Sequence, residues 1–90
     1  MSQPNITVYG SRQCPDTGRA TRFLDSHQMP YEFKDVDENP EYDDYIAGLN
    51  GGTRVLPTIR VNNETLINPD DSSLGASVAA ATEAGRASGL

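Results

Sequence analysis

Residues 6–17 read ITVYGSRQCPDT, and they combine a strand, a short loop and the start of a helix. β-branched and aromatic side chains alternate over residues 5–9, which predicts a strand. Residues 10–13 follow as a loop. A helix is expected to open at Cys14-Pro15, because the first helical position needs no N–H donor and suits proline. The segment therefore places a cysteine at the N-terminus of a helix.

The rest of the chain continues this alternation of strands and helices. Further strands are predicted at residues 31–36, 56–61 and 64–67, and further helices begin at Asn39-Pro40 and after Asn68-Pro69-Asp70-Asp71. Helical spacing gives each helix an apolar face: Ala20, Phe23, Leu24 and His27 on the first; Tyr42, Tyr45, Ile46 and Leu49 on the second; Leu74, Val78 and Ala81 on the third.

The connections fix how these elements associate. The first two strands are joined by a helix and should lie parallel with a right-handed crossover. The last two strands are separated only by Asn62-Asn63 and must form an antiparallel hairpin. We therefore predict an α/β fold of order βαβαββα, with a four-stranded mixed sheet and three helices. It forms a single domain over residues 1–90, with its core at about 5–84 and a frayed tail at 85–90.

Charge and cysteine content narrow the possible functions. Thirteen acidic and seven basic residues give a net charge of −6, which argues against nucleic acid or an anionic membrane as a partner. The denser acidic stretch at residues 35–44 is interpreted as a solvated face, with a docking site for a basic protein as the alternative. A single cysteine excludes an internal disulfide and a zinc site built from thiolates, so no metal site is expected.

The N-terminal sequence lacks a basic region followed by an apolar stretch, as a secretory signal would require. No apolar run approaches the roughly 20 residues that span a membrane. We therefore expect a cytosolic protein.

Cys14 is the candidate reactive group. Unpaired N–H groups and the positive end of the helix dipole stabilise a thiolate at a helix start, which makes a nucleophile at neutral pH. Arg12 can add positive charge, whereas Asp16 opposes the effect. Most free cysteines are small buried hydrophobic residues, and this is the alternative for Cys14. The position after a loop favours an exposed, reactive thiol.

Four segments in this order resemble the glutaredoxin family, and within it the mycoredoxin-like group. They are ITVYGSRQCPDT, MPYEFKDVDENPE, LNGGTRVLPTI and INPDD, and together with the intervening chain they cover about residues 5–82. The resemblance implies a thioredoxin fold, with Cys14 as the nucleophile of a single-cysteine CPDT motif supported by Pro15. It also implies a cis peptide at Leu56-Pro57 that faces Cys14.

The same resemblance implies a groove for a low-molecular-weight thiol such as glutathione or mycothiol. Leu56 would pair with the peptide of the bound thiol through its backbone, Arg54 would lie near it, and Asp70 and Asp71 would hold its far end. Three positions depart from the family pattern. Thr17 replaces the second cysteine of the motif, Ser11 replaces a frequent lysine, and Asn68 replaces part of a Gly-Gly pair.

These residues predict monothiol exchange, in which Cys14 reduces mixed disulfides between proteins and a small thiol. Thr17 could donate a hydrogen bond to the Cys14 sulfur and stabilise the thiolate. The small thiol is a co-substrate, and no tightly bound cofactor is expected. The chain is expected to act as a monomer. Two alternatives stay open: a redox-inactive binding module on the same scaffold, and a dimer that carries an iron-sulfur cluster.

Overall fold

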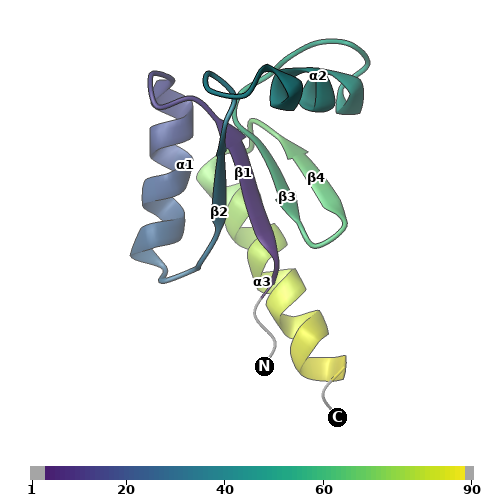
Figure 1. Ribbon diagram of the computed structural model, residues 1–90. Helices are drawn as coiled ribbons and strands as arrows, with labels where there is room; N and C mark the ends of the chain where they lie inside the picture. Colours follow the sequence, from purple (N-terminus) through teal and green to yellow (C-terminus); the bar gives the residue numbers. More distant parts are fainter. Residues whose placement is uncertain (1–3, 89–90) are drawn as a thin grey trace.

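Helices and strands follow one another in the predicted order (Figure 1). The computed structural model describes residues 4–88. The strands are β1 (Ile6–Gly10), β2 (Glu32–Asp35), β3 (Thr58–Val61) and β4 (Glu64–Ile67). The helices are α1 (Pro15–Ser26), α2 (Pro40–Leu49) and α3 (Asp71–Ser88). In this part of the chain, no helix is long and apolar enough to cross a membrane.

The four strands form one mixed sheet in the order β2-β1-β3-β4. β1 pairs with β2 in parallel and with β3 antiparallel, and Val8 is the partner of both Phe33 and Ile59. β3 and β4 form the predicted antiparallel hairpin, with Asn62 at its turn in the left-handed region (φ 55°). The predicted mixed sheet of four strands is therefore confirmed.

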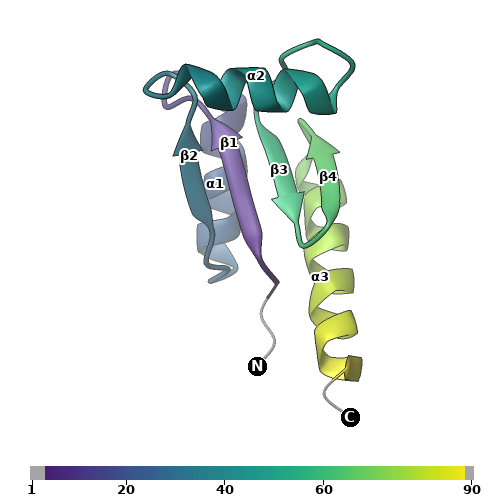
Figure 2. The same cartoon turned by 45° about the vertical axis from the view of Figure 1, so that its right-hand side comes forward.

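One face of the sheet carries the hydrophobic core. Figure 2 shows α1 and α3 behind this face, with α2 across one end of the sheet. The core side chains come from β1, α1, β3 and α3: Ile6, Val8, Ala20, Leu24, Ile59, Val61, Leu74 and Val78. Leu24 and Leu74 are fully buried, as their helical spacing predicts. This packing fixes the N-terminus of α1 at the end of β1.

The predicted apolar face of α2 is only partly correct. Ile46 is fully buried, but Tyr45 is 43% and Leu49 is 37% exposed. Because α2 lies across the end of the sheet (Figure 2), only a narrow part of its surface is covered. The Tyr45 ring instead packs beside Tyr9, with the ring centroids 5.3 Å apart.

Several boundaries differ from the prediction: β1 ends one residue later than expected, and β2 lacks the first and last residues of the predicted 31–36. β3 begins at Thr58, not at Leu56, because Pro57 has no N–H to donate to a strand ladder. α3 continues to Ser88, beyond the start of the expected tail at Gly85. Its sequence is rich in alanine, the strongest helix former, which favours continuation. The last two positions of that tail, 89 and 90, lie outside the described residues.

Candidate active site

Cys14 caps the N-terminus of α1, as the sequence predicts. Its backbone is extended (φ −91°, ψ 118°), and Pro15 is the first helical residue. The Cys14 N–H donates to the Ser11 carbonyl at 3.0 Å, which closes the loop between β1 and α1. The Cys14 side chain is half-buried, so the thiol lies at the surface of the helix start and not in the core.

The surroundings of Cys14 favour the thiolate. Desolvation raises the pKa of the thiol, but the backbone N–H and hydroxyl of Thr17 and the N–H of Asp16 donate hydrogen bonds that outweigh it. The negative charge of the Asp16 carboxylate acts in the opposite direction. Together these groups lower the pKa of Cys14 from its ordinary value of 9.0. A lowered pKa increases the fraction of nucleophilic thiolate at neutral pH.

Thr17 lies in the first turn of α1, directly after the Cys14 cap. Its side chain is only 3% exposed, and its Oγ1 accepts a hydrogen bond from the Ser11 N–H at 3.3 Å. It also packs so closely against Gly10 that a Cβ there would lie 2.5 Å from Thr17 Cγ2. The structure therefore brings Thr17 and Cys14 together and holds Thr17 in place from the end of β1.

Ser11 and Asp37 form a pair that no local sequence pattern predicts. The buried Ser11 hydroxyl donates to Asp37 Oδ2 at 2.5 Å and accepts from the Gln13 N–H at 3.1 Å. Asp37 belongs to the acidic stretch interpreted as a solvated face. The two residues are 26 positions apart, so only the pairing of β1 with β2 reveals their contact.

Arg12 points toward β2. Its guanidinium lies 3.5 Å from the Asp35 carboxylate and 5.2 Å from the centre of the Phe33 ring. A cavity of about 320 Å³ lies in this region, lined by Ser11, Arg12, Thr17, Gly18, Thr21, Tyr31 and Phe33. Arg12, Thr17 and Ser11 therefore border the same cavity. The cavity lining includes neither the buried Pro57 nor the exposed Asp70 and Asp71.

The loop before β3 holds the other predicted residues. The Leu56-Pro57 peptide is cis, as the resemblance implies, and Pro57 is buried. Arg54 is already paired: its Nε lies 2.6 Å from Asp43 Oδ1, and its NH2 group lies 4.0 Å from Asp37 Oδ1. Asp37 thus lies between this loop and the loop that carries Cys14.

Asp70 and Asp71 have different roles in the fold. Asp70 caps α3 by accepting the Ser73 N–H at 2.8 Å, and the backbone and side-chain hydrogen bonds of Ser73 lower the pKa of Asp70. Asp71 forms an ion pair of 2.8 Å with Arg19 of α1.

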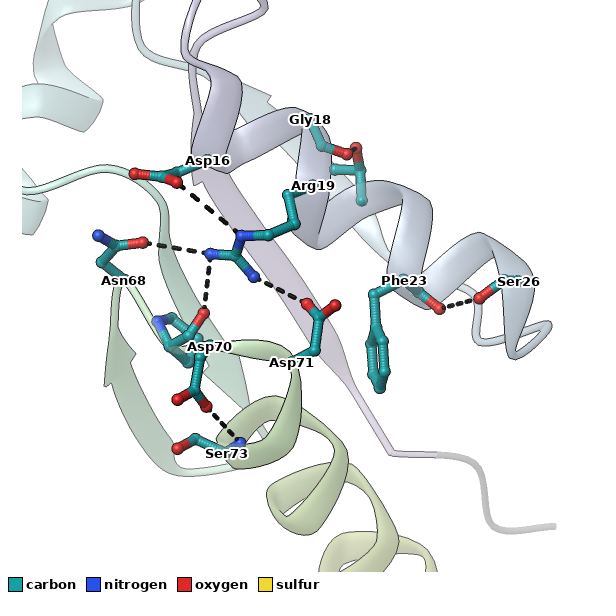
Figure 3. A network of polar contacts seen from close by, with 11 residues as sticks. Asp16, Gly18, Arg19, Phe23, Ser26, Asn68, Asp70, Asp71 and Ser73 are labelled. Carbon is teal, nitrogen blue, oxygen red and sulfur yellow. Dashed lines mark hydrogen bonds and ion pairs between the residues drawn. The ribbon is translucent and has the colours of Figure 1, made fainter.

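Arg19 is a residue that sequence reasoning missed. Figure 3 shows its guanidinium among Asp16, Asn68 and Asp71, and it also donates to the Pro69 carbonyl at 3.1 Å. Arg19 therefore connects the start of α1 to the turn between β4 and α3. Asp16 lies one helical turn before Arg19, but the other partners lie about 50 positions away in the sequence, so helical spacing gives no signal for them.

Comparisons with known proteins agree with this arrangement. Residues 6–66 match the glutaredoxin family model. Mycoredoxin 1 from Corynebacterium glutamicum is 33% identical over 61 residues, which cover 68% of this chain and 75% of that protein.

Solved structures share the fold. Glutaredoxin from Archaeoglobus fulgidus superimposes with a TM-score of 0.73, covering 87% of each chain at 17% identity. The glutaredoxin-like NrdH-redoxin from Escherichia coli has a TM-score of 0.67 at 21% identity, covering 80% of this chain and 92% of that one. The predicted thioredoxin-like fold is therefore confirmed. Because the family model matches more than half of the sequence, this chain belongs to the glutaredoxin family of thiol-disulfide redox proteins.

Proposed function

We propose that the protein catalyses monothiol exchange through Cys14. The Cys14 thiolate attacks the small-thiol sulfur of a mixed disulfide, a new disulfide forms on Cys14, and the protein sulfur leaves as a thiolate. A second small-thiol molecule then attacks the small-thiol sulfur on Cys14. This step releases the Cys14 thiolate and the symmetrical disulfide of the small thiol. One free small-thiol molecule is consumed for each protein thiol restored, and it leaves in the symmetrical disulfide together with the small thiol of the mixed disulfide.

The observation that carries this proposal is the place of a single cysteine at the start of α1. Hydrogen bonds from Thr17 and Asp16 lower the pKa of Cys14, which supports its role as nucleophile. Thr17 occupies the position of the second motif cysteine, which would otherwise attack the disulfide between Cys14 and the small thiol. In this proposal a small thiol from solution makes that attack instead. Arg12 and Pro15 would support the same loop.

For the small thiol we propose a position along Leu56 and Pro57, with Asp70 and Asp71 toward its far end. The charges around this surface favour a thiol without carboxylates. Each nearby arginine already has a carboxylate partner: Arg12 with Asp35, Arg19 with Asp71, and Arg54 with Asp43. Glutathione carries two carboxylates and would have to compete with these pairs, in a chain of net charge −6. We therefore propose mycothiol, whose sugar groups are uncharged, as the preferred co-substrate.

Incubation with oxidised mycothiol and with oxidised glutathione, followed by intact-mass measurement, tests this function. We expect one small-thiol adduct per chain, formed faster with mycothiol, and released when the reduced small thiol is added. The Cys14→Ser variant should form no adduct and should keep its fold, because serine is a favoured N-cap residue. A wild-type chain that forms neither adduct would disprove the exchange activity.

A further inference from the structure

The Thr17 hydroxyl differs from the other threonine hydroxyls of the helices. A threonine in a helix commonly donates its single proton to a carbonyl three or four residues earlier. Thr21 of the same helix does this with the Gly18 carbonyl at 3.1 Å, and Thr82 of α3 does so with Val78 at 2.8 Å. The Thr17 hydroxyl instead accepts a hydrogen bond from the Ser11 N–H, and it helps to lower the pKa of the neighbouring Cys14 thiol.

Ser11 provides a reason for this difference. Its N–H donates to Thr17 Oγ1 at 3.3 Å and therefore occupies an acceptor site of the hydroxyl. The close packing of Gly10 against the Thr17 methyl group restricts rotation of the side chain. With its rotation restricted and an acceptor site filled, the hydroxyl keeps its proton available for the Cys14 sulfur one turn earlier in the helix.

Asp37 in turn fixes Ser11. The carboxylate accepts the Ser11 hydroxyl proton at 2.5 Å, and the same hydroxyl oxygen accepts the Gln13 N–H at 3.1 Å. Ser11 is 5% exposed, whereas the Asp37 side chain is 46% exposed. The N–H, carbonyl and hydroxyl of Ser11 are thus all engaged in shaping the loop before Cys14.

We propose that Asp37 and Ser11 are a positioning pair, which holds the Thr17 hydroxyl so that it donates to the Cys14 sulfur during exchange. Neither residue touches the small thiol in this proposal. Both act through Thr17. The proposal rests on the thiol exchange proposed above, since it concerns the reactivity of the same sulfur.

The charge of Asp37 and its proposed positioning role predict opposite changes in the pKa of Cys14 when Asp37 is replaced. Removing a negative charge near Cys14 should favour the thiolate and lower the pKa of the thiol. Loss of the positioning pair should weaken the Thr17 hydrogen bond and raise that pKa instead. The direction of the change therefore distinguishes a positioning role from a role of charge alone.

The test measures alkylation of Cys14 by iodoacetamide as a function of pH. In Asp37→Ala and Ser11→Ala we expect the midpoint of the profile to move to higher pH. The rate constant well below the midpoint should fall about threefold, as expected for one weakened hydrogen bond. Asp37→Asn keeps an uncharged acceptor and should move the midpoint less, in the same direction. The matched control is Glu38→Ala, which removes an exposed charge next to Asp37 and should not raise the midpoint.

A double-mutant cycle tests whether the pair acts through Thr17. In a Thr17→Val background, where the hydroxyl is absent, Asp37→Ala should change the alkylation profile by much less than in the wild type. An equal change in both backgrounds would overturn the proposal, as would a midpoint that stays unchanged or falls in Asp37→Ala. If Asp37→Ala does not fold by circular dichroism, Asp37→Asn and Ser11→Ala decide the question.

Alkylation does not require thiol exchange, so the two proposals can fail separately. A wild-type chain that shows these shifts but forms no small-thiol adduct overturns the exchange function and leaves the positioning pair in place. A chain that forms the adduct but shows no shifts overturns the positioning pair alone.

Discussion

At the scale of single residues, Thr17 decides how Cys14 can react. It lies one helical turn after Cys14, is buried against Gly10, and provides both a hydroxyl and a backbone N–H to the sulfur. A threonine cannot form a disulfide, so in the proposed exchange the adduct on Cys14 would have no internal route of release. We therefore expect the same residue to favour the thiolate and to leave resolution of the adduct to a second molecule.

Replacing Thr17 with cysteine should open that internal route. The new thiol would lie at i+3 from Cys14, close enough for a disulfide, and cysteine is no larger than threonine at this buried position. We expect Thr17→Cys to form an internal disulfide under mild oxidation and to shorten the life of the small-thiol adduct. Intact-mass measurement with and without alkylation detects both. The control is Thr21→Cys, which lies about 10 Å along the helix and should stay reduced. A fully reduced Thr17→Cys would contradict the placement of the two side chains.

Replacing Asp16 should shift the pKa of Cys14 in a direction that can be predicted. Its carboxylate opposes the thiolate, so Asp16→Asn should lower the pKa of Cys14 further and move the alkylation midpoint to lower pH. The backbone N–H of residue 16 remains in the variant. Asp25→Asn serves as the control, because Asp25 lies about 16 Å along the helix, beyond the Debye length at physiological salt. A midpoint that moves upward in Asp16→Asn would contradict this assignment.

At the scale of elements, Arg19 joins α1 to the turn that begins α3 (Figure 3). It contacts the Asp71 carboxylate at 2.8 Å and the Pro69 carbonyl at 3.1 Å. Arg19 lies in the second turn of α1, and Asp71 is the first residue of α3. The contact therefore sets the position of the Cys14 helix relative to the turn with Asp70 and Asp71.

Loss of this connection should destabilise the protein modestly. We expect Arg19→Ala to lower the free energy of unfolding by about 1 kcal/mol, since the side chain is partly exposed and its hydrogen bonds compete with water. Urea denaturation gives the value. Arg22→Ala, an exposed arginine on the same helix, should have almost no effect. Equal stability of the two variants would show that the Arg19 contacts do not hold the elements together.

At the scale of the whole molecule, the main apolar cluster lies on the side of the sheet under α1 and α3, and α2 adds the buried Ile46 elsewhere. Leu24 is fully buried in the main cluster, whereas Leu49 at the end of α2 is 37% exposed. In a domain of 90 residues the total stability is about 5–15 kcal/mol. The loss of a single buried side chain can therefore remove a large part of the free energy of unfolding.

Two leucine variants test this distribution. Leu24→Ala should cost about 2–5 kcal/mol through lost burial and the cavity left behind. Leu49→Ala should cost less than about 1 kcal/mol, because solvent already covers much of its side chain. Thermal and urea unfolding compare the two. A Leu49→Ala variant as unstable as Leu24→Ala would show that α2 contributes to the core as its sequence pattern suggests.

Local sequence was sufficient to predict the order of elements, the hairpin and the place of Cys14. Alternation, helical spacing, proline at a first helical position and a two-residue turn act over a few residues, so they can be read without the fold. The helix start then predicts the reactive thiol. The apolar face of α2 was predicted too broadly, because helical spacing does not state how much of a helix its neighbours cover.

Only the tertiary structure decided the partners of the polar side chains. Arg19 meets Asp71, 52 positions away, and Ser11 meets Asp37, 26 positions away. Each side chain had several possible partners in the sequence, including solvent. Packing of α1 against α3 and pairing of β1 with β2 selected one of them. Local propensity fixes where a helix or strand forms, but the contact between two charged or polar groups depends on the distance that the packed elements leave between them.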